Sequence, residues 1–418
     1  MRPGPDHGRA TVRIALLSYR GNPYSGGQGV YIRQLSSALV ELGHRVEVLS
    51  GQPYPELRPG VTLTTLPSLD LYRPERPFRL SRPMRDTIDV AEFAIMCVAG
   101  FPEPLTFSLR AWRELAARRR EFDVVHDNQC LGYGLLAINR FLPVLATVHH
   151  PIAIDLRTEL AAAPSRLRRL SLRRWYGFVR MQNRVTRRLP RLLTVSGASR
   201  EAISTEMGIP RERIAVVPNG VDTAFFKPLP HRPRVPGRVM TTASADAPLK
   251  GLATLLEAMA SVRDQRPAEL LVVGRPSRNG EVKRTIDRFG LGRTVRFVSR
   301  VSDVELVRLY AEAEVAVVPS LYEGFSFPAV EAMACGVPVV ATTGGALPEV
   351  IGADGESGLL VPPGDPPALA AAIGCALDDA GLRRRLGAQG RERVGERFSW
   401  RRAAEATVHE YERLINRC

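Results

Sequence analysis

The 418-residue sequence has few cysteines, and the five it has are widely scattered: Cys97, Cys130, Cys335, Cys375 and Cys418. An odd number of isolated cysteines, with no C-x-x-C pair, argues against a disulfide framework and a structural zinc site. The seven histidines do not cluster with them, and no D-x-D triplet is available to hold a divalent ion. We therefore expect no metal site.

Long apolar runs are also missing, since no stretch of eighteen apolar residues occurs that would predict a membrane span. The first apolar run, at 12–18, is short and continues into patterned sequence, so we expect no cleaved signal peptide. With 44% hydrophobic and 24% charged residues, the composition is that of a globular protein. We expect a cytoplasmic location.

Lysine is scarce: the 58 basic residues include only Lys227, Lys250 and Lys283. The formal charge of +15 would favour an anionic partner. However, so strong a preference for arginine along the whole chain indicates a compositional bias, so part of the excess carries no information about partners. No aromatic stacking platform or known binding motif accompanies the charge, and we expect no nucleic acid.

What the sequence does have is a repeated alternation of short β-branched runs with helical patterns. Strands are predicted at 12–18, 44–51, 122–127, 142–150 and 191–196, and a helix at about 29–42. After a segment rich in proline and glycine, six further strands are predicted at 238–244, 268–274, 294–299, 315–320, 337–343 and 357–362. Nearly continuous apolar strands separated by helices predict parallel sheets covered on both faces.

This alternation predicts an α/β chain of two Rossmann-like, doubly wound domains that face each other across a cleft. We place the first domain at 1–217, an interdomain linker at 218–237 and the second domain at 238–394. The final stretch, 395–418, is helical in pattern and is expected to pack back on the first domain.

The stretch EGFSFPAVE, at 323–331, lies between two apolar runs. Pro328 suits the first turn of a helix and Gly336 its end, which predicts a strand-to-helix loop at 320–326. Free N–H groups at such a helix start favour phosphate, while carboxylates such as Glu323 and Glu331 accept from hydroxyl groups. The alternative is that one glutamate is a solvated charge and the other stabilises the helix dipole.

Two further features support an anionic ligand. Gly344 and Gly345 follow the next predicted strand and form a second flexible loop. Lys250 is predicted to begin a helix over 250–263, where a cation meets the unfavourable end of the helix dipole. An anionic ligand would explain that position, and an exposed surface lysine is the alternative.

The segments EGFSFPAVEAMACGVPVVATTGGALPEVI, VVPNGVDTAFFKP and LKGLATLLEAM together resemble the family-4 retaining glycosyltransferases of GT-B fold. GGQGVYIRQLSSALVELGHRVEVLS resembles the first loop and helix of that family, so the resemblance covers nearly the whole chain. It implies an enzyme that moves a sugar from a UDP- or GDP-linked donor to an acceptor hydroxyl. The anomeric configuration is retained, and the co-substrate replaces any cofactor.

The resemblance also implies roles for matching residues. Glu323 would face the donor sugar hydroxyls and Glu331 the ribose, while His149 would lie close to the reacting sugar. The cation of Lys250 would bind the diphosphate. The backbone amides of Gly324, Phe325 and Ser326 would lie near the sugar and the diphosphate, and Gly26 and Gly27 would approach the donor from the first domain. Because the departing phosphate would take the acceptor proton, Glu323 is expected to position the sugar and not to act as a nucleophile.

One position departs from the family pattern. The family usually has an arginine five residues before the lysine, and this chain has Ala245 there. Without that cation the negative charge of the diphosphate is less well neutralised. Donor binding would be weakened by a few kcal/mol, on the order of one charged hydrogen bond. Arg275 or Arg278, in the loop after a predicted strand, could replace it. The departure keeps a non-catalytic sugar-nucleotide-binding protein open, and the shared fold keeps a nucleotide-sugar epimerase open.

The segment 165–191 holds ten arginines and no acidic residue. Treated as one helix, it places five arginines on a narrow arc and its apolar residues on another: Arg169, Arg173, Arg180, Arg184 and Arg187, against Leu167, Leu170, Phe178, Met181, Val185 and Leu189. This is either a core-packed helix with a solvated basic face or a surface attracted to anionic lipid headgroups. The second interpretation predicts peripheral contact with the inner face of a membrane and a lipid or lipid-linked acceptor.

A dinucleotide-dependent oxidoreductase is the remaining alternative, because Glu47 ends the second predicted strand where a ribose-binding acid would lie. The glycine loop GNPYSGGQG does not fit G-x-G-x-x-G, however, and the motifs of the second domain would have no role in such an enzyme.

Overall fold

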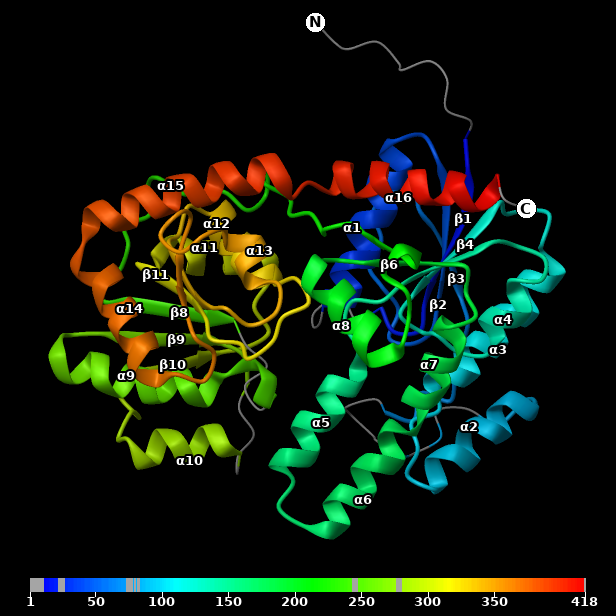
Figure 1. Cartoon of the computed structure of the whole chain (residues 1–418), viewed down its shortest axis with the longest axis horizontal. Helices are drawn as coiled ribbons and strands as arrows, with labels where there is room; N and C mark the ends of the chain where they lie inside the picture. The colour runs from blue at the N-terminus through cyan, green and yellow to red at the C-terminus, as the bar shows by residue number, and fades with distance from the viewer. Residues whose placement is uncertain are drawn as a thin grey trace, which may run out of the picture.

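The structure, a computed structural model, describes residues 11–21, 27–72, 78, 80, 83–242, 247–275 and 280–416. Its described part forms two parallel sheets that lie in separate halves of the molecule (Figure 1). The prediction of a two-domain α/β fold is confirmed by this arrangement.

The first sheet has seven strands in the order β3-β2-β1-β4-β5-β6-β7. Their bounds are β1 (Arg13–Ser18), β2 (Arg45–Ser50), β3 (Thr62–Thr65), β4 (Val124–Asn128), β5 (Val144–Thr147), β6 (Arg191–Thr194) and β7 (Ile214–Val216). The associated helices are α1 (Gly27–Glu41), α2 (Thr87–Cys97), α3 (Glu103–Ala117), α4 (Gly134–Ile138), α5 (Ile152–Ala162), α6 (Arg166–Trp175), α7 (Val179–Thr186) and α8 (Gly197–Met207), with 3₁₀ turns η1 (Tyr176–Phe178) and η2 (Arg211–Arg213).

The second sheet has six strands in the order β10-β9-β8-β11-β12-β13. Their bounds are β8 (Arg238–Thr242), β9 (Glu269–Val273), β10 (Val295–Val298), β11 (Val315–Val318), β12 (Val339–Thr342) and β13 (Leu359–Val361). The helices are α9 (Leu252–Gln265), α10 (Glu281–Arg288), α11 (Asp303–Glu312), α12 (Phe327–Ala334), α13 (Leu347–Ile351), α14 (Pro366–Asp378) and α15 (Ala380–Arg397), and η3 (Pro248–Lys250) is a 3₁₀ turn.

The strand cores explain why the sheets are covered on both faces. In β4 and β5 every residue is buried, as is every residue of β11 and β12. A strand buried on both sides needs helices above and below it, which the βαβ connections supply. Ligands of such sheets bind beyond the carboxyl ends of the strands, so the loops that follow β1, β4, β5, β8 and β11 are the relevant ones.

The last helix, α16 (Trp400–Ile415), leaves the second half and lies beside α1 of the first (Figure 1). Trp400, Ala404, Val408 and Tyr411 pack into one core cluster with Ile14 and Leu16 of β1. The buried Tyr411 hydroxyl lies 2.6 Å from Nδ1 of His126 in β4, a polar contact that fixes the helix on the sheet.

The periodicity of the segment 165–191 predicted one helix, and this prediction is wrong. The segment divides into α6, η1 and α7, and then β6 begins at Arg191. On α7 the apolar residues Met181 and Val185 are buried in the first core, but on α6 Leu167 is 81% and Leu170 is 50% exposed. The two helices differ because α7 packs on the sheet, whereas α6 extends away from it with α5 as its helical neighbour (Figure 1).

Candidate functional site

The loop between β11 and α12 carries most of the candidate residues of the second half. Ser326 caps α12, because its hydroxyl accepts from the N–H of Ala329, and Pro328 lies in the first helical turn. The side chain of Phe325 is buried in the core beside Phe398 and so points away from solvent. Among the described residues, the N–H groups of Gly324, Phe325 and Ser326 have no hydrogen-bond partner. Consecutive unpaired amides before a helix are suited to an anion.

Lys250 and Glu323 meet at this loop. The ammonium Nζ of Lys250 is 2.8 Å from Oε1 of Glu323, and the Ser320 hydroxyl donates to the same oxygen at 2.7 Å. Glu323 is 8% exposed, while the Lys250 side chain is 36% exposed. The lysine therefore lies between a buried carboxylate and solvent, where a ligand anion can also reach it.

The sequence predicted that Lys250 begins a helix, and this prediction is wrong. Lys250 ends the 3₁₀ turn η3, and α9 starts at Leu252 after Gly251 in the left-handed conformation at φ 65°. A Cβ on Gly251 would lie 1.9 Å from the carbonyl oxygen of Pro319 at the end of β11. Only glycine allows this approach, and it brings Lys250 beside the β11 loop.

The loop after β12, which carries the paired glycines, contacts the backbone of Glu323. Gly345 forms an isolated parallel bridge with Glu323, and the N–H of Ala346 donates to the Glu323 carbonyl at 2.9 Å. Because a Cβ at Gly345 would lie 2.3 Å from that carbonyl oxygen, the two loops can pack only if this residue is glycine. The glycines thus position the glutamate through its backbone.

His149 follows β5 and is the candidate residue of the first half. Its Nε2 lies 2.7 Å from Oδ1 of Asn128, and its backbone N–H donates to Oε1 of Gln129 at 2.7 Å. The Nδ2 of Asn128 donates to the carbonyl of Gln28, so Oδ1 faces the imidazole and Nε2 carries the proton. Burial, reinforced by nearby His150, lowers the pKa of His149 to about 3. The ring is therefore neutral, with Nδ1 as its acceptor.

The two halves meet where His149 faces the β11 loop. The Ser199 hydroxyl, on α8, is 3.0 Å from the carbonyl oxygen of His149 and 3.2 Å from that of Gly324. A Cβ on Gly324 would lie 2.6 Å from the His149 carbonyl oxygen. The structure therefore brings the first-half histidine and the second-half amide loop together across one hydroxyl.

Two further contacts cross between the halves near this point. Gly27 begins α1, and a Cβ there would lie 3.2 Å from the ring of Phe327 in α12. The carboxylate of Glu349, on α13, accepts from the N–H groups of Gly197 and Ala198 at the start of α8, at 2.8 and 2.6 Å. The start of α1 thus faces the start of α12.

Glu331 lies in the second turn of α12, and the hydroxyl of Tyr310 donates to its Oε2 at 3.3 Å. Burial, and then the negative charge of Asp303, raises the pKa of Glu331 to about 8. Asp303 itself pairs at 2.9 Å with Arg33 of α1. Among the described residues no cation pairs with Glu331, so its carboxyl group is able to accept or share hydroxyl hydrogens.

Two family models match the chain: "Glycosyltransferase Family 4" over residues 25–225 and "Glycosyl transferases group 1" over residues 236–379. An MMP α-(1→4)-mannosyltransferase from Mycolicibacterium hassiacum is 54% identical, over 97% of this chain and 99% of its own. The chain belongs to glycosyltransferase family 4.

Other relatives of this glycosyltransferase agree with the assignment. A D-inositol 3-phosphate glycosyltransferase from Kineococcus radiotolerans is 29% identical over 96% of this chain and 95% of its own. The sucrose-phosphate synthase structure from Thermosynechococcus elongatus superposes with a TM-score of 0.75 and 25% identity, covering 97% of this chain and all of that chain. The GT-B fold and the glycosyltransferase activity predicted from the sequence are confirmed.

Four positions singled out from the sequence are not part of this geometry. Gly26, Ala245 and Arg278 lie outside the described residues. Arg275 follows β9 and is exposed, and among the described residues it forms no hydrogen bond or ion pair with Lys250 or Glu323. The described residues contain no group of three or more metal-ligating side chains, and none of their helices is long and apolar enough to cross a membrane.

Sequence reasoning missed the residues that hold the candidate side chains in place. Asn128 and Gln129 hold His149, Ser199 joins the halves and Ser320 binds Glu323. Asn128 and Gln129 follow a predicted strand at the edge where ligands bind, which was the one available signal. Gln129 has a left-handed backbone at φ 55°. Its residue type does not predict this conformation, because glutamine rarely adopts a positive φ.

The raised pKa of Glu331 makes the stability of the enzyme depend on pH. The pKa of this carboxyl is about 4.5 in the unfolded chain, its ordinary value, and about 8 in the folded protein. Between these values the folded state binds the extra proton, so this group's contribution to stability falls as pH rises through that window. Glu331→Gln removes the titration. Thermal unfolding from pH 4.5 to 8.5 should therefore show the wild type losing stability relative to the variant as pH increases, and a constant difference would contradict the assignment.

Proposed function

We propose that this glycosyltransferase moves a mannosyl residue from a nucleotide diphosphate donor to a sugar hydroxyl, with retention and without a metal ion. The observation that carries the proposal is the Lys250–Glu323 pair beside the unpaired amides of residues 324–326. The name of the 54% identical relative supports mannose as the sugar and an α-(1→4) linkage as the product.

The proposed donor site divides by charge. The diphosphate takes the amides of 324–326 and the ammonium of Lys250, since both stabilise negative charge. Glu323 would repel phosphate and so takes hydroxyl groups of the sugar. Glu331, whose pKa is raised to about 8, takes the ribose hydroxyls, because its carboxyl group can both accept and donate hydrogen bonds. On donor binding, Lys250 exchanges part of its contact with Glu323 for a contact with the diphosphate.

The proposed chemistry places negative charge on the leaving diphosphate as the glycosidic bond breaks. Fixed amides and one lysine stabilise that charge without reorganisation, which is the role that a metal ion plays in other sites. Glu323 is hydrogen-bonded to Ser320 and paired with Lys250, so it is held as a positioning group. The departing phosphate oxygen takes the acceptor proton, because neutral His149 has too low a pKa, about 3, to act as a base.

His149 is proposed to accept a hydrogen bond from the donor sugar at Nδ1. Its tautomer is set by Asn128, and its main chain is held by Gln129 and Ser199. The contact between the His149 carbonyl and Gly324 then keeps the sugar-binding and phosphate-binding groups at a fixed separation. Closing of the two halves around the donor would complete the site.

The Glu323→Gln variant tests this assignment because it keeps the shape of the side chain and removes its charge. Transfer should fall at least about 100-fold, as expected when a group that acts on the transition state is lost. Nucleoside diphosphate binding, measured by calorimetry, should be retained or strengthened, since Lys250 loses its protein partner. Product analysis by NMR, with and without EDTA, reports the linkage, its configuration and any need for a metal.

A matched control is Glu405→Gln on α16, where Glu405 forms an exposed pair with Arg401. This variant should behave as wild type in both measurements. Equal loss of transfer and nucleotide binding in Glu323→Gln would place Glu323 away from the sugar. A β-linked product would contradict retention from an α-linked donor.

We also propose that α6 contacts an anionic membrane surface and brings the enzyme to a lipid-linked acceptor. The supporting observation is that Leu167 and Leu170 are exposed on a helix whose arginines are all exposed. Apolar side chains surrounded by cations are suited to the interface of acidic lipids.

Vesicle sedimentation at low salt tests this contact. Binding to phosphatidylglycerol vesicles should exceed binding to phosphatidylcholine vesicles, and Leu167→Ser with Leu170→Ser should reduce it. Val304→Ser, which changes an apolar residue on α11 that is about as exposed as Leu170, should not reduce it. Equal binding to neutral and acidic vesicles would overturn the proposal.

A further inference from the structure

Beyond the donor site, aromatic rings gather on the first half. Tyr72 packs against Phe101 and Trp175 with ring centroids 5.3 and 5.1 Å apart, and Phe101 lies 5.0 Å from Trp175 and 5.4 Å from Phe178. We call these four residues the aromatic shelf. All four residues are partly exposed, and only 6% of the chain is aromatic. Phe178 also packs against the first core, whereas Tyr72, Phe101 and Trp175 belong to no core cluster of the described residues.

An ion pair lies at the edge of the shelf. The Nε of Arg20 is 2.6 Å from Oε2 of Glu103, and the guanidinium carbon is 5.8 Å from the centre of the Phe101 ring. The Glu103 side chain is 7% exposed and that of Arg20 is 34% exposed. The pair offers hydrogen-bond donors and acceptors next to each other, which is the combination that neighbouring sugar hydroxyls require.

This pair is adjacent to the residues that hold His149. Glu103 precedes Pro104, whose carbonyl accepts from Sγ of Cys130, the residue after Gln129. On the other side, Tyr19 precedes Arg20 and hydrogen-bonds the side chain of Gln28, whose carbonyl accepts from Asn128. The ion pair therefore lies in the first half, linked through these contacts to the loop after β4 that holds His149.

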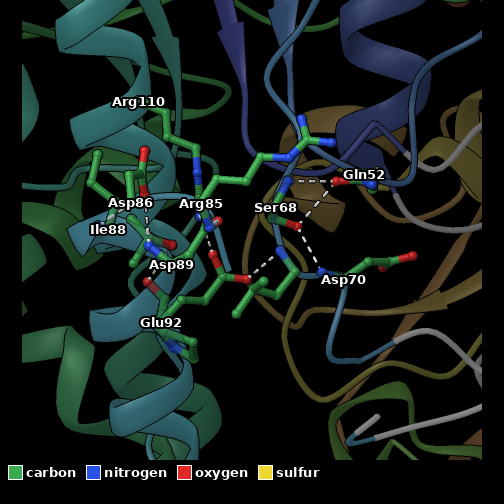
Figure 2. A network of polar contacts seen from close by, with 12 residues as sticks. Gln52, Ser68, Asp70, Arg85, Asp86, Ile88, Asp89, Glu92 and Arg110 are labelled. Carbon is green, nitrogen blue, oxygen red and sulfur yellow. Dashed lines mark hydrogen bonds and ion pairs between the residues drawn. The ribbon is translucent and has the colours of Figure 1, made fainter. Parts of the chain in front are cut away.

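A buried network fixes the segment that carries Tyr72 (Figure 2). Arg110 binds Asp89 at 2.7 Å and Glu92 at 2.5 Å, with all three side chains almost fully buried. Glu92 in turn accepts from the N–H of Leu69 at 3.0 Å. The network ties α2 and α3 to residues 66–72, so the shelf is built on a rigid support.

The charges around the Arg20–Glu103 side of the shelf disfavour an anionic ligand there. Its surroundings include the carboxylates of Asp70, Asp89, Glu92 and Glu103, while the two nearby guanidinium groups, those of Arg20 and Arg110, are already paired with carboxylates. Burial, with further contributions from the charges of Glu92 and Asp70, raises the pKa of Glu103 to about 7 despite the opposing effect of Arg20. A phosphate group at the ion pair would find no unpaired cation among these residues; the exposed arginines Arg173 and Arg174 lie on the other side of the shelf, next to Trp175 on α6.

We propose that the aromatic shelf and the Arg20–Glu103 pair form the acceptor subsite, and that the acceptor group bound there is an uncharged carbohydrate. The apolar face of a sugar ring lies on Trp175 and Phe101, and its hydroxyls bind the ion pair. The proposal rests on the transfer reaction proposed above and specifies its acceptor class. The proposed acceptor class differs from the phosphorylated acceptor in the name of the relative called D-inositol 3-phosphate glycosyltransferase.

The test compares Trp175→Ala with Trp112→Ala, which removes an exposed tryptophan of α3 that is not in the shelf. The probes are α-(1→4)-linked mannotriose and D-inositol 3-phosphate, each with a nucleotide diphosphate mannose donor. Trp175→Ala should raise the KM for mannotriose about tenfold, equivalent to the loss of one well-buried aromatic contact. It should leave the donor KM and the acceptor-free hydrolysis of the donor unchanged, and Trp175→Phe should restore most of the affinity.

An unchanged mannotriose KM in Trp175→Ala would overturn the acceptor assignment, and so would a preference of the wild type for D-inositol 3-phosphate. In either case, turnover of the donor would still support the proposed transfer reaction. If no donor is turned over at all, the transfer proposal fails, and calorimetry still tests the subsite. Mannotriose should then bind the nucleoside diphosphate complex of the wild type and of Trp112→Ala about tenfold more tightly than that of Trp175→Ala. Equal binding to all three would overturn the subsite.

Discussion

The candidate site depends on the close approach of Gly324 to the carbonyl of His149. A side chain at position 324 would lie 2.6 Å from that oxygen, so the two halves can meet in this way only because the residue is glycine. The Ser199 hydroxyl lies within hydrogen-bond distance of both carbonyls and joins them. Through this contact the histidine of one sheet and the amide loop of the other take up fixed positions, as a preorganised site requires.

Around that contact the site is organised by charge. Unpaired amides and Lys250 provide positive potential where a diphosphate would bind, while Glu323 and Glu331 provide acceptors on either side. His149 is kept neutral by burial, which suits it to hydrogen bonding and not to proton transfer. The aromatic shelf adds an apolar surface in the first half, so donor and acceptor would be recognised by different physical interactions.

Much of the fold could be predicted from the sequence because buried parallel strands are apolar along their whole length. The exceptions were β3, a four-residue edge strand that is almost entirely exposed, and β7, which has only three residues. The predicted helix over 165–191 was wrong because periodicity does not reveal that α6 leaves the sheet. The loop around Glu323 could be predicted from Pro328 and Gly336, whereas the positions of Ser199 and Gln129 depend on contacts between distant segments.

The measurement that tests the central claim most directly is a crystal structure with a nucleotide diphosphate mannose or its nucleoside diphosphate bound. The account predicts phosphate oxygens at about 3 Å from the amides of residues 324–326, which is hydrogen-bond distance. It also predicts the ammonium of Lys250 on the diphosphate and the carboxyl group of Glu331 on the ribose. A diphosphate bound away from the β11–α12 loop, or a metal ion bridging it to carboxylates, would contradict the account.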